Sequence, residues 1–328
     1  MDFSLTITNV LVFIALAIPG YILIKTKIVK PSAISFFAAV LLYANQPFLT
    51  LLSFLEVQYS PSLLINLGIA FVVSLAIQFV VFLVIWLFLR KKYKSRQKND
   101  AGFLQTDFDG DRKDIKKDAL RVLTLSCTFG NIGFLGVPLL RALMPLAPEA
   151  ITYSAVYIVT MNLLSWTVGV AALTGDRRYI SVKKAVLNPP TVTLFVALPL
   201  FFSGVHLPEA AMRGIAFLGD ITTPMCMLIL GMRFATAPFV QIFKDWRVWL
   251  ASLVKLAIVP LAVLGVLYLL PLDRTLKLTI YILSAMPTAA STLNLSEVFR
   301  ADANTAANAV LLSTLLCVLT VPALLLLI

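Results

Sequence analysis

Two apolar segments of this chain carry helix-breaking residues near their centres. The first reads Phe-Gly-Asn-Ile-Gly-Phe-Leu-Gly-Val-Pro over residues 129–138, and the second reads Ser-Ala-Met-Pro-Thr-Ala-Ala-Ser-Thr-Leu-Asn over 284–294. Proline removes a backbone donor and glycine loosens a helix, and a lipid core tolerates the freed polar groups only where protein or a water-filled cavity surrounds them. A matched pair of interrupted spans is the pattern that points to the substrate site of an inverted-repeat secondary transporter.

The composition places the chain among integral membrane proteins. Hydrophobic residues make up 60% of its 328 residues and charged residues 13%, whereas soluble proteins carry about twice that charged fraction. A membrane-spanning helix needs about 20 apolar residues. The expected fold is therefore an all-α integral membrane protein with ten transmembrane helices. These spans are predicted near residues 5–24, 34–55, 62–89, 119–143, 150–173, 186–204, 212–232, 247–270, 274–296 and 303–328.

The distribution of basic residues predicts the topology. Of the 27 Lys and Arg residues, 22 lie in the loops that follow odd-numbered spans, four lie in the other loops, and Lys255 lies within a span. The positive-inside rule then predicts that the 22-charge side is cytoplasmic and that both termini are extracytoplasmic. Topology accounts for the net charge of +11, so no nucleic-acid partner is expected. The first apolar stretch lacks a basic leader and a cleavage site, so we expect a retained helix.

The two halves of the chain resemble each other in the order of their helix breakers. Pro19 in the first span corresponds to Pro199 in the sixth, and Pro47 in the second corresponds to Pro224 in the seventh. The broken fourth span corresponds to the broken ninth. Five spans are an odd number, so the second half must insert upside down relative to the first. The predicted inverted five-helix repeats are residues 1–173 and 174–328.

The breaks in the fourth and ninth spans would bring helix ends together near the middle of the membrane. Helix N-termini favour an anion, and free carbonyls at C-termini can accept from a hydroxyl or a cation. The alternative is a pair of kinked but closed helices whose polar side chains bond back to their own backbone. The candidate substrate-binding residues at the breaks are Asn131, Gly133, Pro138, Pro287, Ser291, Thr292 and Asn294.

Four further polar residues lie within predicted spans. Asp220 and Lys255 are candidate coupling or gating residues. A charged side chain inside the membrane is costly unless an opposite charge or water surrounds it, so such residues usually have a function. They could instead form a structural pair with each other or extend to the membrane surface. Asn45 and Gln46 either face the same cavity from the second span or pack between helices.

Several segments are similar to the auxin efflux carrier family of membrane transporters. Residues 130–139 resemble its fourth-helix signature, and Asn188-Pro189 resembles the start of its sixth helix. Residues 218–231 resemble its seventh helix and residues 286–290 its ninth. The similarity runs in the same order over essentially the whole chain.

That resemblance implies a fold like that of bacterial sodium/proton antiporters and bile-acid symporters. Spans 1, 2, 6 and 7 would form a scaffold, and spans 3–5 and 8–10 a transport unit. The crossover asparagine maps onto Asn131 and the crossover proline onto Pro138, whereas Thr292 stands where plant members carry a second proline. The ninth-span break would then depend on Pro287. The short connection over 174–185 indicates a compact, bacterial-type member of the family, which would lie in the plasma membrane. Such a protein could form a homodimer through the scaffold helices.

The resemblance implies a secondary transporter that moves a small organic anion, such as malate, malonate or an auxin-like acid, by alternating access. Alternatives are a symporter or antiporter coupled to H⁺ or Na⁺, with a cation site like that of bile-acid symporters, and an anion channel. An enzyme is not expected, because no clustered nucleophile, base or metal ligands occur. The three cysteines lie within spans and show no metal-site spacing, so neither a metal nor a cofactor is expected.

Overall fold

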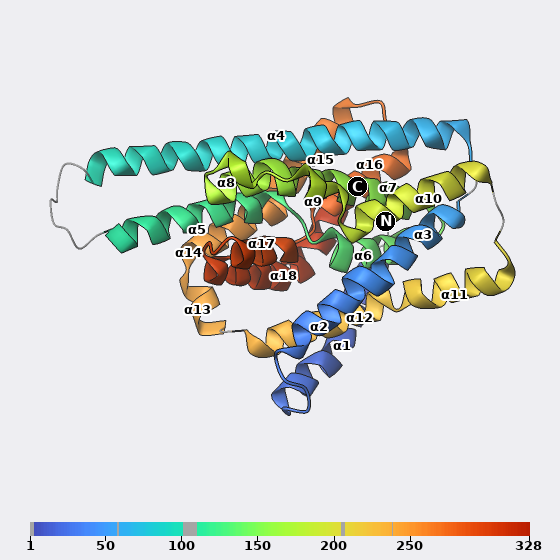
Figure 1. The fold of residues 1–328 in the computed structure, drawn as a ribbon, viewed down its shortest axis with the longest axis horizontal. Helices are drawn as coiled ribbons and strands as arrows, with labels where there is room; N and C mark the ends of the chain where they lie inside the picture. The colour runs from blue at the N-terminus through green and yellow to red at the C-terminus, as the bar shows by residue number, and fades with distance from the viewer. Residues whose placement is uncertain (1–2, 58, 101–109, 205–206, 238) are drawn as a thin grey trace.

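The computed structural model describes residues 3–57, 59–100, 110–204, 207–237 and 239–328 (Figure 1). Across these ranges the secondary structure is helical, with no strand, which confirms the all-α prediction. The α-helices are α1 Phe3–Lys25, α2 Ala33–Val40, α3 Gln46–Leu55, α4 Pro61–Asp100, α5 Gly110–Thr128, α6 Val137–Leu143, α7 Glu149–Leu164, α8 Val170–Thr174, α9 Val182–Val186, α10 Pro189–Ser203, α11 Glu209–Asp220, α12 Thr222–Thr236, α13 Phe239–Lys244, α14 Trp246–Leu253, α15 Val259–Leu269, α16 Arg274–Ser284, α17 Ala290–Val298 and α18 Ala303–Leu325.

Six continuous helical runs among the described residues are long and apolar enough to cross a membrane. Shorter apolar helices occupy parts of the expected first, fourth and sixth spans, and α16 with α17 occupies the ninth. The count of ten spans and their inverted arrangement therefore stay predictions. The six runs are Ala33–Leu55, Pro61–Lys91, Glu149–Thr174, Glu209–Thr236, Trp246–Leu269 and Ala303–Leu325.

Both predicted breaks are present. The helix α5 ends at Thr128 and helical structure resumes at Ile132, whereas α16 ends at Ser284 and α17 begins at Ala290. The alternative of two kinked but closed helices is therefore wrong. Glycine and proline explain the interruptions, because neither segment can maintain an unbroken ladder of i to i−4 hydrogen bonds.

Several spans contain a turn of π-helix, in which one extra residue widens the helix. Such bulges are frequent at functional sites because they redirect side chains. The turn η1 ends at Asn45, directly before Gln46, and the turn η5 contains Lys255. The four π-helical segments are η1 Leu41–Asn45, η2 Ile132–Gly136, η3 Ser165–Gly169 and η5 Val254–Ile258.

Close helix packing joins the two halves of the chain. The helices α1 and α12 lie side by side at one corner of the molecule, away from α4 and α5 (Figure 1). A Cβ atom added to Gly20 would overlap the carbonyl oxygen of Leu228, and one added to Gly231 would overlap that of Ala17. Small residues allow such close approach, which is how helices associate in the absence of a hydrophobic driving force.

Candidate functional site

The two breaks pair with each other through their backbones. The Asn131 N–H donates to the Pro287 carbonyl at 2.7 Å, and the Ala289 N–H donates to the Phe129 carbonyl at 2.9 Å. These bonds make an antiparallel bridge between Gly130 and Thr288. Each break thus satisfies polar groups that the other has freed, which a lipid core would not do.

One side of this crossing is packed and fully bonded, and we call it the packed face. The Lys255 ammonium, only 2% exposed, donates to the Ser284 carbonyl at 3.0 Å. The Thr288 hydroxyl donates to the Ser126 carbonyl at 2.9 Å, and its backbone N–H donates to the Ser313 hydroxyl at 3.0 Å. The packed face consists of Ser126, Lys255, Ser284, Thr288 and Ser313.

Lys255 lies where two helices end. The last turns of α5 and α16 both approach it, and a Cβ added to Gly130 would lie 3.3 Å from the Lys255 Nζ. Helix C-termini carry a partial negative charge, so an ammonium at this point stabilises both ends. This arrangement explains a buried lysine that has no carboxylate beside it.

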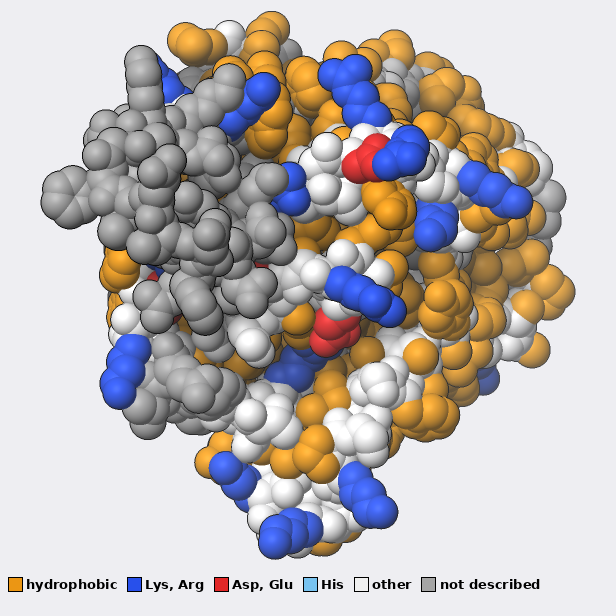
Figure 2. Space-filling model, turned by 60° about the vertical axis from the view of Figure 1, so that its left-hand side comes forward, with side chains coloured by type: hydrophobic (Ala, Val, Ile, Leu, Met, Phe, Trp, Pro, Cys, Tyr) orange, Lys and Arg blue, Asp and Glu red, His pale blue; other side chains and the backbone are white. Residues whose placement is uncertain are grey.

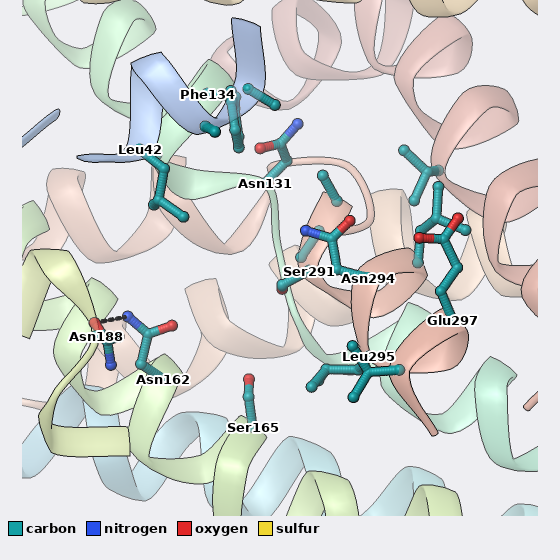
Figure 3. Close-up of a pocket in the computed structure, with 18 of the residues that line it drawn as sticks. Leu42, Asn131, Phe134, Asn162, Ser165, Asn188, Ser291, Asn294, Leu295 and Glu297 are labelled. Atoms are coloured by element: carbon teal, nitrogen blue, oxygen red, sulfur yellow. Dashed lines mark hydrogen bonds between the residues drawn. The ribbon is translucent and has the colours of Figure 1, made fainter. Parts of the chain in front are cut away.

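The other side of the crossing borders a cavity of about 1140 Å³. Asn131 reaches it from the first break, and Ser291 and Asn294 reach it from α17 (Figure 3). Among the residues that the structure describes, these three side chains form no hydrogen bond with the protein. We call them the cavity face. Across the cavity, the Asn162 amide donates to the Asn188 side chain at 3.1 Å (Figure 3).

Two other predicted residues, Gln46 and Gly133, also line the cavity. A Cβ added to Gly133 would overlap the Gln46 amide, so the two residues pack directly against each other. This contact joins the second span to the π-helical turn after the first break. Gly133 has no side chain to offer a ligand, and its role here is to admit Gln46.

The remaining predicted site residues do not line the cavity. Pro287 participates through its carbonyl, and Pro138 is buried in the first turn of α6. The Thr292 hydroxyl is buried without a hydrogen-bond partner in the structure. Asn45 donates through its amide to the Leu218 carbonyl at 3.1 Å, so the helix-packing alternative holds for it and the cavity-facing alternative is wrong.

The cavity opens toward the loops that carry most of the basic residues. Its rim includes residues of the loops after the first, fifth and seventh expected spans and the end of α17. Figure 2 shows Lys and Arg side chains around a hollow on this face of the molecule. The rim residues are Pro31, Ser181, Lys183, Lys184, Thr236, Ala237 and Glu297.

Arg233 is a cavity residue that the sequence did not reveal. It lines the main cavity and, with Asn131, an adjoining pocket of about 30 Å³. In the described chain its guanidinium forms no hydrogen bond or ion pair, although the Glu297 carboxylate attracts it. From its position at the end of an apolar span, Arg233 resembles any loop cation. A free guanidinium beside an unbonded amide marks a place for an anion.

Charged residues meet where α3, α6 and α11 end, and we call them the outer cluster. Arg141 on α6 bonds to Asp220 on α11 at 2.7 Å and lies 3.7 Å from Glu56, which follows α3. Burial raises the pKa of Glu56, the charge of Arg141 lowers it, and that of Asp220 raises it. Burial is the largest of these effects, so the pKa of Glu56 is raised overall, and at 3.7 Å Glu56 is the more distant partner of Arg141. The outer cluster consists of Glu56, Arg141 and Asp220.

This cluster corrects the prediction for Asp220. Its side chain is 60% exposed and pairs with Arg141, whereas Lys255 bonds to a backbone carbonyl. The Asp220–Lys255 pair is therefore wrong. Counting residues from the span ends misplaced Asp220, because α11 ends at this residue and a new helix begins at Thr222.

Comparison with known proteins agrees with this geometry. The family model described as "Membrane transport protein" matches residues 113–325, which include both breaks and the packed face. The chain belongs to this family of auxin efflux carriers. An uncharacterized transporter of Methanocaldococcus jannaschii is 25% identical over 215 residues, which cover 63% of this chain and 68% of that protein.

Family membership fixes the broad class of the molecule. It is a multi-pass membrane protein of a transporter family, a class that is generally non-enzymatic. The family match runs from residue 113 to 325, so it includes all but the last three residues of the second half and the last part of the first. The resemblance noted from four short segments is thereby confirmed.

Proposed function

We propose that this protein is a secondary carrier that moves a small organic anion across a bacterial plasma membrane by alternating access. A carboxylate such as malate, malonate or an auxin-like acid would bind beside the crossing. Asn131, Ser291 and Asn294 would donate to its oxygens, and Arg233 would supply the opposite charge. The observation that carries this proposal is the cavity whose wall is the pair of breaks, with three polar side chains left unbonded there.

The charges around the cavity favour an anion. Among the described residues of its lining, the basic ones are Arg233, Lys183 and Lys184, and the acidic one is Glu297. The first turn of α17 also faces the cavity through Ala290 and Ser291, and a helix N-terminus attracts negative charge through its free N–H groups. A cation would meet the net positive charge of this lining.

Closure at one end favours a carrier over a channel. The cavity opens on the basic face, whereas Arg141 bridges Asp220 and Glu56 at the other ends of the spans. An anion channel would need a continuous path, and a carrier needs only one open end at a time. The positive-inside rule makes the open face cytoplasmic and both termini extracytoplasmic in this proposal.

Packing between the halves supports the inverted-repeat arrangement. The first span packs against the seventh as α1 with α12, and the sixth packs against the second as α10 with α3. In an inverted repeat, the first span is equivalent to the sixth and the second to the seventh, so these two contacts are equivalent to each other. The fourth and ninth spans are also equivalent, and their breaks pair with each other. Alternating access would then move the transport unit against the scaffold, with H⁺ or Na⁺ as the candidate coupling ion.

Flux into liposomes tests this function. The purified protein should catalyse saturable exchange of a labelled mono- or dicarboxylate, and external substrate should accelerate its own counterflow. A matched amine should not be transported. Linear, non-saturating flux would support a channel, and the absence of flux for every carboxylate in a broad screen would contradict the anion proposal.

A further inference from the structure

The two repeats place charged residues at corresponding positions, with the signs exchanged. Glu56 lies nine residues after Pro47, and Arg233 lies nine residues after the corresponding Pro224. These prolines anchor the second and seventh expected spans. A glutamate of the first repeat thus corresponds to an arginine of the second.

The second member of each pair follows one of the breaks. Gly130 and Thr288, which face each other in the bridge, are the corresponding positions of the two breaks. Arg141 lies eleven residues after Gly130, and Glu297 lies nine residues after Thr288. Both charges thus lie in the helical segment that follows a break, again with the sign exchanged, so the pair Arg233–Glu297 is the approximate counterpart of the pair Glu56–Arg141.

In this structure the first pair is in contact. Arg141 lies 3.7 Å from Glu56 and 2.7 Å from Asp220, and these contacts join α6 of the transport unit to α3 and α11 of the scaffold. They lie at the closed ends of the spans. Breaking them would be necessary for that end to open.

The second pair is open. Arg233 on α12 of the scaffold and Glu297 on α17 of the transport unit both line the cavity that reaches the basic face. Glu297 extends from α17 in the same direction as Asn294 (Figure 3). Neither charged side chain forms an ion pair with any residue that the structure describes. Moving α17 toward α12 would bring the two charges together and narrow the cavity's opening.

We propose that Glu56–Arg141 and Arg233–Glu297 are two reciprocal ion-pair gates of the transport cycle. When the first pair is closed the second is open, as here, and closing the second pair opens the first. This inference rests on the alternating-access part of the proposed function. Exposed ion pairs contribute little net stability, so either gate can open in every cycle without a large barrier.

Cysteine cross-linking tests the reciprocity directly. In a background lacking Cys127, Cys226 and Cys317, the pair Glu56→Cys with Arg141→Cys should cross-link efficiently in the resting protein. The pair Arg233→Cys with Glu297→Cys should cross-link only during turnover. The control pair Phe234→Cys with Glu297→Cys should not, because Phe234 packs against the hydrophobic cluster around Ile242 and Val248. Peptide mass spectrometry measures each cross-link.

The cross-links should also have opposite effects on the cavity. With Ser291→Cys as a reporter, the Glu56–Arg141 cross-link should leave the reporter reactive from the basic face. The Arg233–Glu297 cross-link should protect it. A reporter that stays reactive behind the second cross-link would overturn the proposal, as would a second pair that never cross-links while transport proceeds.

Charge exchange gives an independent test. In an Asp220→Asn background, Glu56→Arg and Arg141→Glu should each slow transport about tenfold, and the double exchange should recover to within about threefold, because the pair is restored with its signs reversed outside the substrate cavity. Losses that simply add would contradict a gate between these residues. If a solute other than a carboxylate is transported and the cross-links are reciprocal during its turnover, the anion proposal fails while the gates stand.

Discussion

The two faces of the crossing lie on opposite sides of the same pair of breaks and yet have opposite characters. On the packed face, the side chains of Lys255 and Thr288 donate to carbonyls, and the Thr288 backbone N–H donates to the Ser313 hydroxyl. On the cavity face, Asn131 and Ser291 leave their side chains unbonded. Polar groups on one face therefore hold the broken helices together, and those on the other are free for a ligand.

The difference distinguishes polar side chains that hold the fold together from polar side chains that are free to bind a ligand. Buried polar groups are normally bonded, because an unmade hydrogen bond is costly in a medium without water. The packed face follows that rule. A cluster of unbonded amides and hydroxyls persists beside it only because the cavity admits water or substrate.

The largest expected effect concerns Lys255. Lys255→Ala should lower the free energy of unfolding by about 3 kcal/mol, because it removes a charged hydrogen bond and leaves a cavity at the packed face. Thermal unfolding in lipid nanodiscs measures this loss, with Lys244→Ala at an exposed position as the control. Carboxylate affinity at a temperature where the variant is folded should change little. A large loss of affinity with normal stability would move Lys255 from the packed face to the substrate site.

The next effect concerns Asn131. Asn131→Ala should weaken carboxylate binding more than tenfold, a cost of about 1.4 kcal/mol, because one buried polar contact to the ligand is lost. Its melting temperature should stay close to that of the parent, since the Asn131 side chain forms no hydrogen bond with any described residue. Isothermal titration and melting curves measure both quantities, with the exposed Asn304→Ala as the matched control. Unchanged affinity would show that the cavity face does not bind substrate.

A smaller effect is expected where the second span meets the first break. A methyl group at Gly133 would overlap the Gln46 amide, so Gly133→Ala should slow transport several-fold by displacing the turn that carries Asn131. Adding Gln46→Ala should restore much of the rate by making room. Gly68→Ala is the control, because nothing lies near its Cβ position. Failure of the double variant to recover would indicate that Gln46 itself contacts the substrate.

The smallest effect is expected at the outer cluster. Asp220→Asn should destabilise the protein by less than about 1 kcal/mol, because the Asp220 side chain in this ion pair is 60% exposed. Chemical denaturation at low and high salt measures this, and the difference from the parent should shrink as salt screens the charges. A loss well above 2 kcal/mol, independent of salt, would mean that Asp220 is buried in the membrane after all.

The sequence allowed the breaks to be predicted, because glycine and proline interrupt helices wherever they stand in an apolar run. It also indicated Asn131, Ser291 and Asn294 as polar residues beside those breaks. The resemblance to a transporter family supplied the crossing of the two segments. Their hydrogen-bonded pairing is a finding of the structure, since no local pattern records which carbonyl receives the Asn131 N–H.

Contacts between distant segments were beyond the sequence. Nothing local distinguishes Asn45, which bonds to α11, from its neighbour Gln46, which reaches the cavity, because a π-helical turn ends between them. Arg233 was indistinguishable from a loop cation until the fold placed it beside Asn131. Asp220 was misplaced because an interruption between α11 and α12 is invisible to a count of apolar residues.

One labelling experiment tests most directly whether the cavity face binds an organic anion. In a background lacking the three native cysteines, Ser291→Cys should react with a membrane-impermeant thiol reagent applied to the basic face. Saturating malate, malonate or an auxin-like acid should protect it by more than about tenfold, because an occupied site excludes the reagent. A matched amine should give no protection. Labelling that no carboxylate slows would contradict a substrate site at the crossing.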